Sequence, residues 1–196
     1  MTRQFVSYAG WSAYVSAAGT ITTFVSAILF FSLGQPFGSI NDIASVFQVI
    51  LMLPLALVLY LLFRPHSQTL SFLAAAMGIG GILVGGVIQS LLVAGVISFQ
   101  QTVSFFPAGA AIGGWLMLNS YLSLTRHLLP RGLAWLGLLA GIGYITSVTG
   151  FLLGGYQNPL FLAGGLLTVI CYPIWALWLG RVLVSGNPER VHAHGI

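Results

Sequence analysis

The chain has 196 residues, of which 58% are hydrophobic and only 4% are charged. Soluble domains carry about 25% charged residues, so this composition excludes a soluble globular domain and predicts an integral membrane protein. The formal net charge of +4 comes from arginines that are scattered singly between apolar stretches, which excludes the clustered basic face that binds nucleic acid.

The first apolar stretch, residues 13–33, follows Arg3. It is longer than the apolar core of about 7–15 residues that a secretory signal peptide carries. It matches the roughly 20 helical residues that cross a hydrocarbon core about 30 Å thick. We therefore expect a membrane helix here and not a cleaved signal.

Five further apolar stretches follow in the chain, and short breaks rich in Pro, Gly, Asn, Gln and Ser separate them. Asp42 is expected to cap the start of the second helix, and Pro65 follows the end of that helix. The predicted fold is an all-α integral membrane protein, a single six-transmembrane-helix bundle over residues 1–186 with a short polar tail over 187–196. The six helices are predicted near 13–33, 43–63, 70–97, 105–124, 133–153 and 160–183.

The arginines predict the orientation of this bundle. With six spans, all of them fall on one side of the membrane, and the loops 34–42, 98–107 and 154–159 contain none. Arginine-rich loops stay in the cytoplasm. Both termini and the polar tail are therefore expected on the cytoplasmic side, and the arginines that define it are Arg3, Arg64, Arg126, Arg131, Arg181 and Arg190.

The second, fourth and sixth predicted helices each end with an aromatic residue just before an arginine, as in YLLFR (60–64). The helices that precede the fourth and sixth are rich in Gly and Ala. This pattern indicates three helical hairpins, although Tyr, Trp and Arg are also enriched at every membrane interface.

Glycines four residues apart are frequent in the predicted helices and allow two helix backbones to approach closely. Two interpretations stay open: an interface with another subunit or a second copy, and internal packing of a tight bundle. The pairs are Gly81/Gly85, Gly109/Gly113, Gly137/Gly141 and Gly150/Gly154.

No Asp, Glu, Lys, Arg or His lies near the middle of a predicted span. Proton relays, voltage sensors and ion-coupled carriers use such groups, and acid–base catalysis needs them as well. The four histidines are peripheral and Cys171 is the only cysteine, so the sequence indicates neither a bis-histidine haem nor a metal site. We expect a protein that is not an enzyme.

The polar residues that remain at depth are neutral. They either hydrogen-bond a neighbouring helix or line a pocket for an uncharged or lipid-like small molecule, a pigment included. The candidates for such a pocket are Gln48, Gln89, Asn119 and Tyr144, and the identity of any cofactor stays open.

The motifs HLLPRGLAWLGLLAGIGYI (127–145), LPLALVLYLLFR (53–64) and PIWALWLGRVLVSG (173–186) resemble those of a bacterial family of multi-pass membrane proteins known as a domain of unknown function. The resemblance covers roughly residues 45–186. It implies a six-span protein of the bacterial cytoplasmic membrane and brings no activity or site.

Two functions are compatible with these observations. The first is a structural or accessory membrane protein that acts by helix–helix contact, as a small subunit of a larger complex or by self-association. The second is a carrier or binding protein for an uncharged or lipid-like small molecule. The lipid bilayer is the partner in both.

Overall fold

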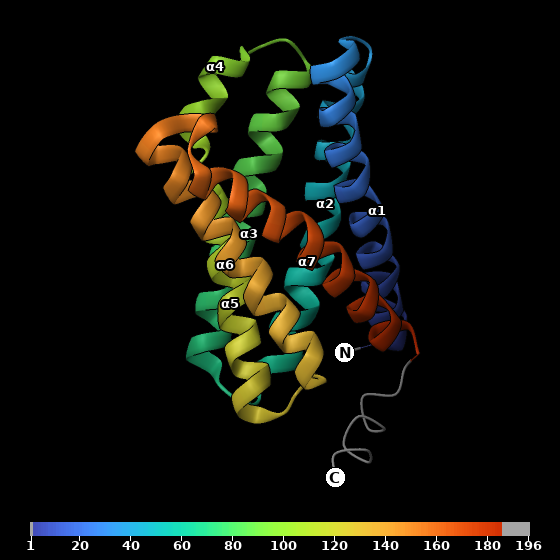
Figure 1. Ribbon diagram of the computed structural model, residues 1–196. Coiled ribbons are helices and arrows are strands. Elements are labelled where there is room, and N and C mark those ends of the chain that lie inside the picture. Colours follow the sequence, from blue (N-terminus) through green and yellow to red (C-terminus); the bar gives the residue numbers. More distant parts are fainter. Residues whose placement is uncertain (1, 186–196) are drawn as a thin grey trace.

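The computed structural model describes residues 2–185, and this part of the chain consists of helices joined by short turns (Figure 1). The predicted tail, residues 187–196, lies outside the described residues. The helices are α1 (Arg3–Leu33), α2 (Phe37–Phe63), α3 (Gln68–Val93), α4 (Phe99–Thr102), η1 (Val103–Phe105), α5 (Ala108–Arg126), α6 (Arg131–Gly154), η2 (Gly155–Gln157) and α7 (Pro159–Val184).

Two predicted helix starts were wrong. Helix α1 begins at Arg3 and not near residue 13, and the Thr2 hydroxyl accepts a hydrogen bond from the Phe5 amide at this end. Helix α2 begins at Phe37, because the turn after α1 is completed within residues 34–36, where Gly34 takes a positive φ of 78°. Asp42 therefore lies inside α2 and does not cap it.

Five of the six predicted spans correspond to helices that are long and apolar enough to cross a membrane: α1, α2, α3, α6 extended through η2, and α7. The protein is thus a multi-pass membrane protein. Helix α5, in the place of the fourth predicted span, has 19 residues and is less apolar. Its residues from Ile112 to Leu116 are all buried, so neighbouring helices rather than lipid surround much of it.

The six long helices form a ring by their contacts, and α7 crosses the bundle at an angle (Figure 1). Each packs against its neighbours in the sequence, with α3 followed by α5, and α7 returns to pack against α1. The pairs α1–α2, α3–α5 and α6–α7 are each in contact, as three hairpins would be. However, α2–α3, α5–α6 and α1–α7 contacts join them into one continuous ring.

Glycines mark the closest approaches within this ring. A Cβ atom added at Gly113 of α5 would lie 2.8 Å from the carbonyl oxygen of Gly141 in α6, and one added at Gly180 of α7 would lie 2.8 Å from that of Gly10 in α1. Most members of the predicted glycine pairs therefore serve packing inside the bundle. Those that face a neighbouring long helix at close range include Gly81, Gly109, Gly113, Gly137, Gly141 and Gly150.

Packing is uneven along the bundle. We call the end that carries Arg3, Arg64, Arg126, Arg131 and Arg181 the arginine end. In the half toward this end, side chains such as Leu55, Trp115 and Tyr172 are fully buried. In the other half, α2 has no buried residue before Met52 and α3 has none after Ile82. The hydrophobic core thus occupies the half of the bundle nearer the arginines.

Because lipid gives helices no hydrophobic reason to associate, this close backbone contact is expected to carry much of the stability. We predict that Gly113→Ala lowers the stability of the purified protein in detergent by about 1–3 kcal/mol, the usual cost of overpacking. Gly80→Ala is the matched control, because Gly80 lies in α3 with no atom within 4 Å of an added Cβ. Both variants gain the same helix propensity, so equal melting curves would contradict the prediction.

Candidate functional site

Polar side chains from three helices lie in the half away from the arginine end, in two groups: one at the α1–α2 contact and one between α2 and α3. We call Thr23 of α1, Asn41, Asp42 and Gln48 of α2, and Gln89 of α3 the polar cluster. The Asn41 side-chain amide donates a hydrogen bond to the Thr23 carbonyl oxygen at 2.6 Å. The Thr23 hydroxyl donates to the Thr20 carbonyl oxygen at 2.9 Å and lies 3.5 Å from Gln48 Oε1. All five side chains are half-buried. In this half, hydrogen bonds connect helices where apolar packing is sparse.

Asp42 gives the polar cluster its only carboxylate. The Gln89 side-chain amide donates to Asp42 Oδ1 at 3.3 Å and so connects α3 to α2. A carboxylate can accept about four hydrogen bonds, and Gln89 keeps a second N–H and its carbonyl oxygen. Asp42 and Gln89 can therefore each form further hydrogen bonds with a ligand.

The depth of Asp42 follows from helix geometry. Along α2 the rise from Asp42 to Arg64 is roughly 33 Å at 1.5 Å per residue, close to the roughly 30 Å of a hydrocarbon core. With Arg64 at one membrane surface, Asp42 lies near the opposite surface. The predicted absence of ionisable groups from the middle of the spans is consistent with this depth, although Asp42 belongs to a long helix and not to a loop.

An apolar groove of about 250 Å³ lies between α2 and α3, and neither Asp42 nor Gln89 is among the residues that line it. Sequence neighbours of the pair line it, namely Ile43, Val46, Phe47, Ser90, Val93 and Ala94. Phe47 and Val93 are exposed, so the groove opens toward the surroundings of the bundle. A lipid-facing groove next to a hydrogen-bonding pair suits a molecule with an apolar chain and a polar head.

The four predicted pocket residues do not form one site. Gln48 and Gln89 both belong to the polar cluster. Asn119 is buried in α5 and donates to the carbonyl oxygen of Trp115 in its own helix at 2.8 Å. Tyr144 of α6 packs against Gly113 of α5. Asn119 and Tyr144 therefore serve the packed core.

Sequence reasoning missed three members of the polar cluster. Thr23 and Asn41 gave no signal of their own, because a hydroxyl or an amide near a helix end is common in any membrane protein. Asp42 did carry a signal, since it is the only acidic residue before Glu189. Its interpretation as a helix cap hid its position between two helices.

The core also contains polar groups. Ser16 of α1 and Tyr172 of α7 share a buried hydrogen bond of 2.7 Å. Within the described residues, the buried side-chain atoms without a hydrogen-bond partner are Ser71 Oγ, Trp115 Nε1 and Thr168 Oγ1. Trp115 stands edge-on to Trp175, with ring centroids 6.0 Å apart. These groups are enclosed by side chains and belong to the core.

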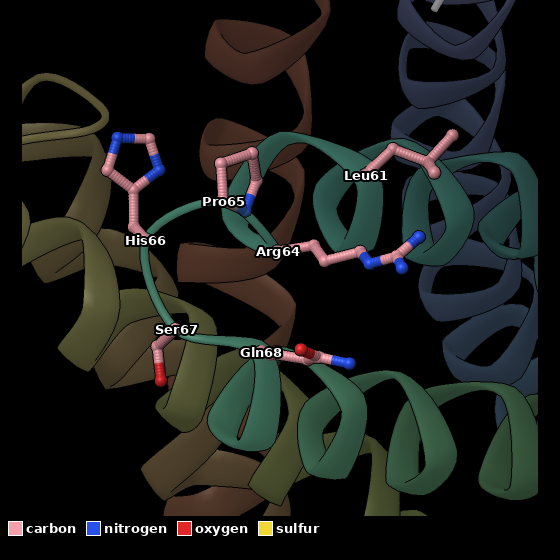
Figure 2. Close-up of a pocket in the computed structure, with 6 residues that line it drawn as sticks. All are labelled: Leu61, Arg64, Pro65, His66, Ser67 and Gln68. Carbon is pink, nitrogen blue, oxygen red and sulfur yellow. The ribbon is translucent and has the colours of Figure 1, made fainter.

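A second pocket, of about 600 Å³, lies at the arginine end where α2 turns into α3. Leu61 and Arg64 from the end of α2 and Gln68 from the start of α3 extend their side chains on the same side of the turn, whereas the His66 ring points away from them (Figure 2). Pro65, His66 and Ser67 complete the lining.

The residues that the structure describes contain no group of three or more His, Cys, Asp and Glu side chains placed to bind a metal ion. Cys171 is buried in α7.

Comparisons of the chain with protein-family models, with curated proteins and with solved structures found no match. The resemblance to a bacterial membrane-protein family therefore stays a prediction from the three motifs. Function has to be argued from the physical chemistry of this chain.

Proposed function

We propose a six-span topology in which α5 is the sixth membrane-crossing helix and both termini are cytoplasmic. With 19 residues, α5 is roughly 28 Å long at 1.5 Å per residue. Its polar residues Asn119, Ser120 and Ser123 are buried, so its lower hydropathy does not prevent it from crossing the membrane. The distribution of arginines supports the orientation, and the family resemblance supports the bacterial cytoplasmic membrane.

Single cysteines on either side of α5 test this topology in a Cys171→Ala background. Gln100→Cys and Thr125→Cys flank the helix, and both positions are exposed. We predict that a membrane-impermeant maleimide added to intact cells labels Gln100→Cys, and labels Thr125→Cys only after permeabilisation. Labelling of both positions in intact cells would mean that α5 does not cross, and a reversed pattern would invert the orientation.

For the function, we propose a binding or carrier protein for a lipid-like small molecule with an uncharged, hydrogen-bonding head. The observation that carries this proposal is the apolar groove beside Asp42 and Gln89. Ligand pockets are mostly apolar with a few placed polar groups, and the groove with its polar pair has this composition. Its volume of about 250 Å³ is below the roughly 300–1,000 Å³ of typical ligand pockets, which suits part of one apolar chain.

The position of the pair favours such a ligand over a fully apolar one. Near the membrane surface the head of an amphiphile meets water and polar groups, and its chain points into the hydrocarbon region. A hydroxyl head can donate to Asp42 and accept from Gln89. One neutral hydrogen bond contributes about 0.5–1.5 kcal/mol, and a bond to a charged group contributes about 1.5–3 kcal/mol.

The probe for this proposal is a monoacylglycerol with a diazirine in its acyl chain, photolysed on the purified protein and mapped by peptide mass spectrometry. We predict saturable labelling concentrated in residues 43–47 and 90–94, displaced by unlabelled monoolein. Asp42→Asn and Gln89→Leu together should weaken displacement by about tenfold, which corresponds to about 1.4 kcal/mol.

Ser90→Trp should fill the groove and remove this labelling. Leu83→Trp is the matched control, because Leu83 is also exposed on α3 but does not line the groove. Labelling that is uniform over all lipid-facing helices and cannot be displaced would refute the proposal.

One observation favours the accessory role as a second candidate. Ala76 and Gly80 of α3 are four residues apart and both exposed, and Gly80 meets no neighbouring atom. This small-residue surface remains free after internal packing is complete, and small residues at this spacing are enriched at interfaces between membrane helices.

Native mass measurement in mild detergent tests this second role. If α3 joins another subunit or a second copy, we predict a complex that Gly80→Ile dissociates and that Ala18→Ile leaves intact, since Ala18 is exposed on α1 and not on α3. A monomer without any copurifying protein would contradict the accessory role and leave the lipid-binding proposal in place.

A further inference from the structure

The pocket at the α2–α3 turn combines a concave shape with positive charge. Its volume is about 600 Å³, and the Arg64 guanidinium lies beside the Gln68 side chain on the same side of the turn (Figure 2). Arg64 and Gln68 are both exposed. Within the described residues Arg64 takes part in no hydrogen bond through its side chain, so its donors are free for a ligand.

The surroundings of this pocket are positive. Arg3, Arg126, Arg131 and Arg181 occupy the same end of the bundle, and Asp42, the one acidic residue among residues 2–185, lies at the opposite end. The field at this end therefore attracts anions. Within the described part of the chain, no carboxylate is near enough to neutralise Arg64.

From this shape and charge we propose that the pocket binds the phosphate head group of an anionic phospholipid. Guanidinium presents paired N–H donors that match two phosphate oxygens. The Gln68 amide supplies a further donor, and the Ser67 hydroxyl makes no capping bond to α3. Basic pockets between helices on the cytoplasmic side are typical sites for anionic head groups.

The lipid is favoured over a soluble anion because apolar surface adjoins the polar lining. Leu61 lines the pocket itself. Phe72 and Leu73, one turn into α3, are 64% and 47% exposed, so acyl chains beneath the head group meet apolar side chains. A soluble phosphate has no acyl chain and would make no contact with this apolar surface. The site is separate from the Asp42–Gln89 pair and does not depend on the function proposed above.

The test uses the full chain in nanodiscs or mild detergent and counts bound lipid by native mass spectrometry during titration with phosphatidylglycerol. The protein is expected to bind phosphatidylglycerol in preference to phosphatidylcholine. Arg64→Gln should weaken this binding by about tenfold or more, because it removes a charge-assisted, bidentate contact. Arg64→Lys keeps the charge without the paired donors and should recover only part of the affinity.

Two variants serve as matched controls. Arg126→Gln and Arg181→Gln each remove an exposed arginine from the same end, at the last residue of α5 and in the last turn of α7, and neither residue lines the pocket. Both should retain binding, and melting curves should confirm that every variant is folded.

If Arg126→Gln weakens binding as much as Arg64→Gln does, the attraction is a diffuse surface charge and the pocket proposal is wrong. If inorganic phosphate displaces phosphatidylglycerol at equal concentration, the site recognises a soluble anion and the lipid assignment fails. Selectivity for phosphatidylglycerol that Arg64→Gln alone removes would support the proposal.

Discussion

The architecture depends on the contact of one helix backbone with another at glycine. Lipid chains are as apolar as leucine, so burial of apolar surface does not hold membrane helices together, and close van der Waals fit must do so. Gly113 lies against Gly141 and Gly10 lies against Gly180, and in each case a single added methyl group would meet a backbone oxygen within 3 Å. These contacts set the spacing of the α5–α6 and α1–α7 pairs in the ring.

The two halves of the bundle use different means of association. Near the arginine end, large side chains such as Trp115, Tyr172 and Phe63 fill the interior completely. In the other half, hydrogen bonds from Asn41 and Gln89 hold α1 and α3 to α2. The buried side chains are therefore concentrated in one half of the bundle, and the half-buried polar groups lie in the other.

The positions of the spans were predictable from the sequence, but which helices pack against one another was not. Length and hydropathy located α3, α6 and α7 to within a few residues, because an apolar run of this length has few alternatives in a membrane. The extra turns at the start of α1 were missed since polar residues near an interface do not end a helix. Ring closure between α1 and α7 was not predictable, because helices that are apolar on nearly every face carry no periodic signal for the buried side.

For the candidate site as well, the polar residues were predictable from the sequence but their contacts were not. Gln48 and Gln89 were predicted as polar residues within the spans, whereas the pairing of Gln89 with Asp42, near the end of α3 and the start of α2, depends on how far α2 extends beyond the apolar stretch. Asn119 was indistinguishable from them in sequence, yet its amide serves its own helix. In a membrane protein, composition indicates which groups are polar at depth, and the crossing of helices decides which of them meet.

The last helix in the chain has a particular place in biosynthesis. Helix α7 packs against α6, its predecessor, and against α1, the first helix to be made. Until α7 leaves the ribosome, Ser16 lacks its Tyr172 partner and the small residues of α1 face lipid or an insertion factor. A chain that ended before α7 would therefore leave Ser16 without this partner and the ring open between α1 and α6.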